Sequence, residues 1–491
     1  MLHALRGGGP TNFFGGTQLA WLGDPLQLGP LGTSTPLLPP SETNASVAAP
    51  GQGDRGYGQW LFSQCEQEVY VLYDQHRIVD ERYAEICHNM RTRWAQYEDP
   101  KMRTIAMQAD ADTLNTRVLQ GTGARRTELL LEVRSNARAW HSGVGLSQTN
   151  DVASAMGEQR ALAFAQAAGQ HVIAYTAVDA EMRGAVTPAK AGSAVPGTKT
   201  RKRYTAFPLI GGDMKGLVDE VSRYNLRKAG YTPSTFYYIE SSEDDEIDQR
   251  QPGLRYTIQV TGDQHGSKQY PMLQYCNRQV GRLVRLYLDQ REGIDTDTLE
   301  ESGVTHLKYP PLAAAFVPDV PAGAARPLPT LDLEALEAAG LKDFPLNAWP
   351  LCLSEVRFSF KAKSSGASIL IQRANIRATP YTGITTHAAQ GANTALTVVH
   401  FCMRMLVDLR DPALVLVALS RVKRLADLIL LTSIDMKLLE WLTTTAKGTH
   451  RQQEWDRLVR AARTRKEAKG LVPSPREQRE WDEVESRRSA K

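Results

Sequence analysis

The order of apolar and polar residues in the first half of the chain predicts helices with one buried face. Between residues 60 and 107 the apolar positions recur at helical spacing, for example at Tyr83, Ile86 and Met90, which is typical of an amphipathic helix. Residues 155–178 have the pattern of an Ala-rich helix followed by a strand. This βαβ-like alternation predicts an α/β region.

The pattern changes in the middle of the chain. Leu254–Val260 and Val356–Lys361 alternate with a period of two, as half-buried antiparallel strands do. A Pro-rich connection, residues 310–329, lies between them. We therefore expect a small β-barrel-like insertion at residues 254–380. Helices and strands alternate again up to Ile434, and a polar helical tail follows.

Composition excludes several classes of protein. The 491 residues are 42% hydrophobic and 23% charged, as in an ordinary globular protein. The five cysteines are scattered and form no Cys-x-x-Cys pair, which argues against a zinc site and against a secreted disulfide framework. No stretch approaches the roughly 18 apolar residues that a membrane helix needs. We therefore expect a reducing compartment, no metal ligands and no membrane partner.

The net charge of +4 is concentrated near one end of the chain. Residues 449–491 hold 12 Lys or Arg and 8 Asp or Glu, so the rest of the chain is neutral overall. A second basic cluster is Lys199–Arg203. Both are typical of solvated surfaces. A nuclear-import signal at Lys199–Arg203, and hence a nuclear location, stays open as the alternative.

The first candidate motif lies near the start of the chain. The apolar segment before Gly23 has the pattern of a strand that ends in Gly23-Asp24-Pro25, with Gln27 two residues further on. Open α/β sheets place their ligands at the carboxyl ends of their strands. Asp24 and Gln27 are therefore candidate ligand-binding residues, although an ordinary βα turn would have the same Gly-Asp-Pro.

The second candidate motif lies more than 350 residues later. Ile384–Gly391 has the pattern of a strand that ends in Thr386-His387 and turns through Gln390-Gly391, and the apolar segment Val415–Arg421 has that of a further strand. Hydroxyl, imidazole and free backbone N–H groups are suitable donors to the phosphates of a single nucleic-acid strand. The alternative for Arg421 is a structural ion pair.

In this order the motifs resemble the later motifs of superfamily 1B DNA helicases, closest to the PIF (petite integration frequency) type. The preceding Phe13-Phe-Gly-Gly16 and the segment Leu72–Arg77 add to the resemblance. The resemblance implies RecA-like motor domains and ATP-driven 5′-to-3′ DNA unwinding in repair, recombination or telomere maintenance. It also implies ATP and Mg²⁺ as cofactors and single-stranded DNA as partner, with no other small-molecule substrate.

The resemblance also assigns roles to individual residues. It implies contacts to the γ-phosphate from Gln27, Arg77 and Arg421, with Arg421 as the arginine finger. It implies nucleotide contacts at Asp24, Gln27 and Gly391, and DNA contacts at Thr386, His387 and Gln390. The chain departs from the family at Ala388-Ala389, where the family has Lys-Ser, and at His76, where it has an aromatic residue.

The family's phosphate loop is not found in the sequence. No Gly-Lys-Ser or Gly-Lys-Thr occurs, although this loop binds the β- and γ-phosphates. The family's acidic magnesium-binding segment is not found either. The acidic segments Val79–Arg82 and Leu217–Ser222 follow the Gly-Asp-Pro motif, whereas the family's segment precedes it, and both have helical patterns. We therefore expect the back portion of a motor that does not hydrolyse ATP alone. The alternative is a non-catalytic single-strand-binding remnant, possibly transposon-derived.

The expected fold is α/β: a RecA-like parallel-sheet motor domain with an inserted small SH3-like β-barrel, preceded by the last strand of a first RecA-like domain. In chain order the expected parts are the remnant of the first RecA-like domain (1–40), a Gly/Pro-rich linker (41–59), the first part of the second RecA-like domain (60–253), the inserted barrel-like domain (254–380), the second part of the second RecA-like domain (381–440) and the polar basic helical tail (441–491).

Overall fold

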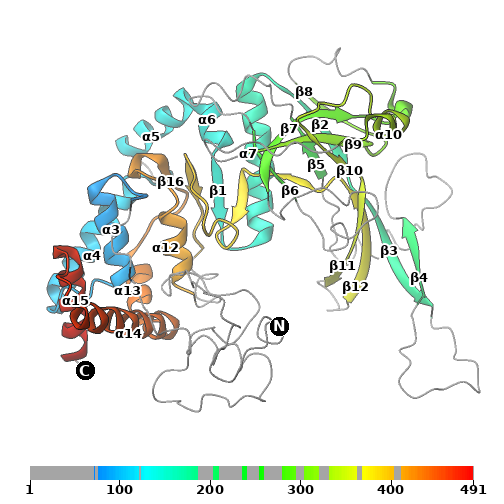
Figure 1. Ribbon diagram of the computed structural model, residues 1–491. Helices are drawn as coiled ribbons and strands as arrows, with labels where there is room; N and C mark the ends of the chain where they lie inside the picture. The colour runs from blue at the N-terminus through cyan, green and yellow to red at the C-terminus, as the bar shows by residue number, and fades with distance from the viewer. Residues whose placement is uncertain are drawn as a thin grey trace, which may run out of the picture. The chain divides into compact units, whose positions relative to one another are not determined.

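A computed structural model of the protein describes residues 71, 76–120, 123–185, 203–208, 235–239, 254–258, 279–294, 303–319, 331–361, 368–402 and 411–489. The chain divides into two compact units (Figure 1). The first consists of Met1–Arg134, Gly145–Ala153 and Ile384–Lys491, and the second of Ser135–Val144 and Ser154–Gly383. None of the helices in the described part is both long and apolar enough to cross a membrane.

The first unit is built on a four-stranded sheet. Its strand order is β14 (Gly383–Thr385), β1 (Val144–Ser147), β15 (Thr397–Val399) and β16 (Leu428–Leu430). β15 and β16 are parallel, and every residue of β1, β15 and β16 is buried. Short apolar strands buried on both faces are typical of a parallel sheet covered by helices. The expected α/β class with parallel strands is thereby confirmed.

Seven helices of the described part belong to the first unit. They are α3 (Glu81–Thr92), α4 (Pro100–Asn115), α5 (Ala124–Ser135), α12 (Ala413–Leu419), α13 (Met436–Thr444), α14 (Ala446–Ala468) and α15 (Pro475–Ser489), with the short 3₁₀ turn η5 (Leu425–Asp427). The Asp80 and Asp435 side chains accept hydrogen bonds from the N–H groups of Tyr83 and Leu438 in the first turns of α3 and α13, which satisfies donors without an intrahelical partner. The helices predicted between residues 60 and 107 are confirmed from Glu81 on, and so is the helical tail, whereas residues 60–70 and 72–75 lie outside the described residues.

The strand predicted at Val415–Arg421 is wrong, because these residues lie in and just after α12. The helix starts at Ala413, whose N–H donates to the Asp411 side chain over 3.1 Å, and Ser420 is its C-cap. A short, uniformly apolar and buried segment has no polar face, so periodicity cannot separate a helix from a strand there. Pro412 and the Asp411 cap favour the helix.

The second unit contains three sheets and the helices α6 (Ala137–Ser142) and α10 (Leu333–Ala338), with the turn η3 (Gln290–Glu292). The long helix α7 (Asn150–Ala168) follows β1 directly. The five-stranded sheet has the order β10 (Trp349–Cys352), β9 (Ala313–Pro318), β7 (Val280–Tyr287), β6 (Tyr256–Ile258) and β13 (Ala378–Pro380). The four-stranded sheet has the order β11 (Ser354–Lys361), β12 (Ser368–Asn375), β3 (Val178–Ala185) and β4 (Arg203–Pro208). The three-stranded sheet has the order β5 (Thr235–Tyr238), β2 (His171–Thr176) and β8 (Gly303–His306).

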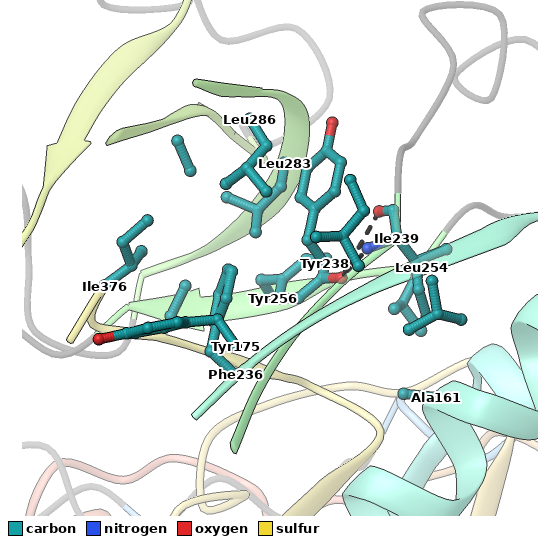
Figure 2. Packing of buried hydrophobic residues seen from close by; sticks show 14 of the residues in the cluster. Ala161, Tyr175, Phe236, Tyr238, Ile239, Leu254, Tyr256, Leu283, Leu286 and Ile376 are labelled. Carbon is teal, nitrogen blue, oxygen red and sulfur yellow. Dashed lines mark hydrogen bonds between the residues drawn. The ribbon is translucent and has the colours of Figure 1, made fainter. Parts of the chain in front are cut away.

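A large apolar core holds the second unit together. Figure 2 shows side chains from α7, β5, β6 and β7 packed into one cluster, with Tyr256 at its centre. The Tyr256 ring is fully buried, and its hydroxyl accepts a hydrogen bond from the Ile239 N–H over 2.9 Å. A buried tyrosine needs such a partner for its polar end, so this bond fixes β6 against the end of β5.

The two period-two segments are confirmed as antiparallel strands, although they belong to different sheets. β6 pairs with β7 and β13, and β11 pairs with β12. β12 also pairs with β3, at Arg373 opposite Asp179. Strands before residue 254 therefore share a sheet with strands after it. The compact unit consequently extends to Ser154, and its limit does not coincide with the expected boundary at residue 254. The two ends of the five-stranded sheet are different strands, β10 and β13.

Candidate nucleic-acid site

The turn after β14 is anchored to the end of β1. The Thr386 N–H and hydroxyl both donate to the Ser147 carbonyl, over 2.8 and 3.2 Å, and Thr386 is fully buried. The Thr385 hydroxyl accepts from the Ala388 N–H over 3.3 Å. Gly391 closes the turn with φ +85°, a conformation that costs a glycine little. The turn from 385 to 391 is therefore held in one conformation at the carboxyl end of β14.

Arg421 lies beneath this turn and is 1% exposed. Its guanidinium donates to the Ala389 carbonyl over 3.2 Å, to the Ala392 carbonyl over 3.0 Å and to the Val417 carbonyl over 2.7 Å. A fourth bond, 2.8 Å long, runs to the Ser420 hydroxyl. The planar guanidinium presents five donors in a fixed arrangement, so one side chain joins the end of α12 to the turn of the second motif.

Two further residues connect the same region. The Arg77 guanidinium donates to the Ser420 carbonyl over 3.3 Å, which places Arg77 next to Arg421. Thr394 is 7% exposed, and its N–H and hydroxyl donate to the Arg421 carbonyl over 3.1 and 3.2 Å. The structure thus brings Arg77, Arg421 and the turn at 385–391 together. Asp24 and Gln27 lie outside the described residues.

Two buried ionisable groups, Tyr83 and Cys87, lie close to Arg421, and burial raises the pKa of each. The Tyr83 hydroxyl donates to the Leu419 carbonyl, and burial raises the pKa of Tyr83 well above its usual value. Burial also raises the pKa of the neighbouring Cys87 thiol to about 12, and the nearby positive charge of Arg421 acts in the opposite direction. Both groups are therefore neutral at physiological pH and offer no negative charge to the guanidinium.

Four polar groups at the end of β1 and β15 are buried without a hydrogen-bond partner among the described residues: the Ser147 hydroxyl, the Gln148 amide nitrogen, the Thr149 hydroxyl and His400 Nδ1. They are neighbours, because the His400 N–H donates to the Leu146 carbonyl over 2.9 Å and the Gln148 side-chain oxygen accepts from the Cys402 N–H over 3.3 Å. An unpaired buried polar group costs about 1–3 kcal/mol. Buried groups of this kind are usually satisfied by ordered water.

This cluster contains residues that the motifs did not single out. Ser147, Gln148 and Thr149 stand between an apolar strand and the helix α7. A short polar sequence between a buried strand and a long helix is the signal that could have identified them. Thr394 was not singled out either, and its bonds to the Arg421 carbonyl give it a structural role in this site.

The residues of the turn that are predicted to contact DNA or the nucleotide differ in their accessibility. Gln390 and Gly391 are exposed and His387 is half-buried, whereas Thr386 is fully buried. The exposed part of the turn can therefore meet a ligand directly. Thr386 and Arg421 act in this structure by holding the turn in place. The individual roles implied by the family resemblance stay predictions.

One group of possible metal ligands occurs in the described part, although no metal ligands were expected. His88 on α3 and Glu480 and Glu483 on α15 have ligand atoms within 4.8 Å of one another. Glu480 already accepts a hydrogen bond from the Trp455 indole over 2.8 Å, and Arg487 lies 3.6 Å from Glu483. The group is therefore part of a polar contact between the helices α3, α14 and α15. The acidic segment at Val79–Arg82 is a helix start capped by Asp80, as expected from its helical pattern.

Comparisons with known proteins complete the description. No family model matches the chain, and no curated protein sequence matches it. Among solved structures, the chain is similar to a Pif1 helicase from Candida albicans at 12% identity and a TM-score of 0.34, covering 77% of this chain and 58% of that one. A Bacteroides Pif1 bound to ssDNA is 11% identical with a TM-score of 0.35, covering 89% of this chain and 67% of that one. A Bacteroides Pif1 in complex with ADP-AlF3 and ssDNA is 9% identical with a TM-score of 0.32, covering 74% and 52%. The chain therefore spans about half to two thirds of these proteins.

Proposed function

We propose that this chain is the DNA-gripping part of a PIF-type superfamily 1B DNA helicase and binds single-stranded DNA at the carboxyl ends of β14 and β1. The observation that carries the proposal is the anchored turn at 385–391, because its exposed residues Gln390 and Gly391 stand at the carboxyl end of β14. Phosphate oxygens accept hydrogen bonds from hydroxyl, amide and backbone N–H groups. The exposed Gln390 side-chain amide offers such a donor to a strand laid across this turn.

Within this proposal the side chains divide into two kinds. Gln390, His387 and the backbone of Gly391 would touch the strand. Thr386 and Arg421 are positioning residues, because their hydrogen bonds fix the turn relative to β1 and α12. Arg77 would add a positive charge beside the end of α12. In a complete motor the same region would transmit the state of the nucleotide to the grip on DNA, during 5′-to-3′ unwinding in repair, recombination or telomere maintenance.

The test is single-strand binding by the purified chain. We expect weak binding that weakens further with salt, because neutralised phosphates release counterions. Gln390→Ala and His387→Ala should each weaken it several-fold. Gln108→Ala, an exposed substitution on α4, is the matched control and should leave binding unchanged. Equal binding by all three variants and the unmodified chain would remove Gln390 and His387 from the site.

A second candidate is a non-catalytic single-strand-binding protein, possibly transposon-derived. It is favoured by Arg421, whose guanidinium is used on protein oxygen atoms, and by the lack of Gly-Lys-Ser or Gly-Lys-Thr in the sequence. Positioning of the triphosphate is the main contribution of such enzymes to phosphoryl transfer, so we expect no DNA-stimulated ATP turnover from this chain alone.

ATP turnover with and without single-stranded DNA tests this expectation, which both candidates share. Robust DNA-stimulated turnover that Arg77→Ala abolishes would show that the chain holds a triphosphate and hydrolyses it. Arg77→Ala is preferred to Arg421→Ala here, because the half-buried Arg77 has a single hydrogen bond to Ser420 among those described.

A further inference from the structure

The helix pair α14–α15 carries its positive charge at one end. Residues 464–479, called the basic tip below, contain five Lys or Arg and two Glu, a net formal charge of +3. The remainder of residues 449–491 contains seven basic and six acidic residues. A solvated surface that served solubility alone would mix the two signs. This separation of charge points to an anionic partner at the tip.

The loop at the tip is held rigidly by its own sequence. Gly470 adopts φ +64°, and the Leu471 N–H donates to the Lys466 carbonyl over 3.1 Å, which ends α14 in a Schellman motif. Ser474 and Glu477 form a reciprocal capping box at the start of α15, with bonds of 3.2 and 2.6 Å. Lys466 reaches across to Glu477 over 2.5 Å. The helix ends and the loop are therefore fixed before any partner binds.

This rigid loop exposes two apolar side chains. Leu471 is 55% exposed and Val472 is 85% exposed. Basic residues flank them on both sides, with Lys469 before them and Arg479 after them, both exposed. The cluster of Trp455, Val459, Trp481 and Val484 packs α14 against α15. Leu471 and Val472 do not belong to this cluster.

We propose that the basic tip binds the end of a DNA duplex at a junction with single-stranded DNA. Leu471 and Val472 would lie against the terminal base pair, as apolar side chains do when they wedge against base steps. The basic residues on α14 and α15 would contact the phosphates of the two strands. Basic residues on both sides of an apolar surface match the end of a duplex, where two phosphate backbones flank the terminal base pair. The inference rests on the proposed function, since the single-stranded part of the junction is the partner proposed for the turn after β14.

The test measures binding of a duplex with a 5′ single-stranded tail and of a single strand of equal length, at two salt concentrations. Lys469→Glu with Arg479→Glu should weaken binding of the tailed duplex about tenfold and lower the salt slope by about two, because roughly one counterion is released for each phosphate contact. Leu471→Ser with Val472→Ser should reduce the preference for the tailed duplex and leave the salt slope unchanged. Lys101→Glu, an exposed charge reversal on α4, is the control.

The possible results separate this inference from the proposed function. If the unmodified chain binds the single strand and the tip variants bind the tailed duplex as well as it does, the tip inference fails and the proposed function survives. Binding of neither DNA by the unmodified chain overturns both. An equal loss on both DNAs overturns the junction as the partner. Tip-dependent binding to phosphatidylserine vesicles with unchanged DNA binding would show that the tip meets a membrane surface.

Discussion

The Arg421 guanidinium donates to the Ala389 carbonyl over 3.2 Å, across 32 positions of the sequence. This bond joins the two parts of the second motif, which the sequence shows only as separate segments. It also shows that Arg421 in this conformation stabilises the site from within. A role as arginine finger would require the side chain to leave a position in which four hydrogen bonds hold it.

Arg421→Ala should lower the free energy of unfolding by about 3 kcal/mol, because it leaves the Ala389 and Ala392 carbonyls without this donor in a buried place. Arg424→Ala, an exposed substitution three residues later, is the control and should cost less than about 0.5 kcal/mol. Urea unfolding followed by circular dichroism measures both. Equal stability of the two variants would contradict the structural role of Arg421.

Asp110→Ala should be among the most destabilising substitutions in the first unit. The Asp110 carboxylate is 1% exposed and accepts from Arg82 over 2.6 Å, from the Asn89 amide over 2.9 Å and from the Trp94 indole over 2.8 Å. Its removal leaves the buried Asn89 amide and Trp94 indole donors unpaired, which costs about 1–3 kcal/mol for each group. Asp112→Ala on the exposed face of the same helix should have little effect in the same urea titration.

The Arg117–Glu132 pair makes stability depend on pH in the acid range. Two bonds of 2.8 Å join the guanidinium to both carboxylate oxygens, and this hydrogen bonding lowers the pKa of Glu132 below 4.5. A lowered folded-state pKa contributes stability above the unfolded-state pKa, and this stability is lost as the pH falls through the folded-state value. Glu132→Gln should therefore be less stable than the unmodified chain at pH 7, and the difference should shrink at pH 3. The control is Glu128→Gln, in an exposed pair with Arg125, whose effect should be small at both values.

Gly281→Ala tests the packing of the second unit. A Cβ atom at Gly281 would lie 2.3 Å from the Val317 carbonyl oxygen and 2.5 Å from the Phe316 ring, so β7 and β9 would have to separate. Such overpacking costs about 1–3 kcal/mol. Gly157→Ala in α7 is the matched control, because its Cβ would stand 3.3 Å from Gly383 and alanine favours a helix by about 1 kcal/mol. Comparable thermal unfolding of both variants would rule out the close contact at Gly281.

Sequence patterns located part of the fold and part of the site. The amphipathic helices after residue 80, the helix–strand pair of α7 and β2, and the strands β6 and β11 follow from local periodicity. The pairing of β12 with β3 could not be predicted, because it joins residues almost 200 positions apart and no local pattern specifies a partner. α12 was mistaken for a strand because it is apolar throughout.

The site shows the same division. The proximity of Arg421 to the turn at 385–391 followed from the order of the motifs. The burial of Thr386 and the unpartnered groups at Ser147 and Gln148 did not, because they depend on how β1 enters the sheet between β14 and β15.

The contacts of Arg421 with the turn have a consequence for mutational tolerance. Its bonds to residues 389 and 392 end on backbone oxygens, which every amino acid provides. Alanine at position 389 therefore provides this contact as well as a residue with a polar side chain would. Ala389 has no exposed surface, so that position should accept small residues alone, while residue 392 should accept many. A saturation library selected for folding would thus recover Arg at position 421 almost uniformly, whereas position 392 in the neighbouring turn would vary.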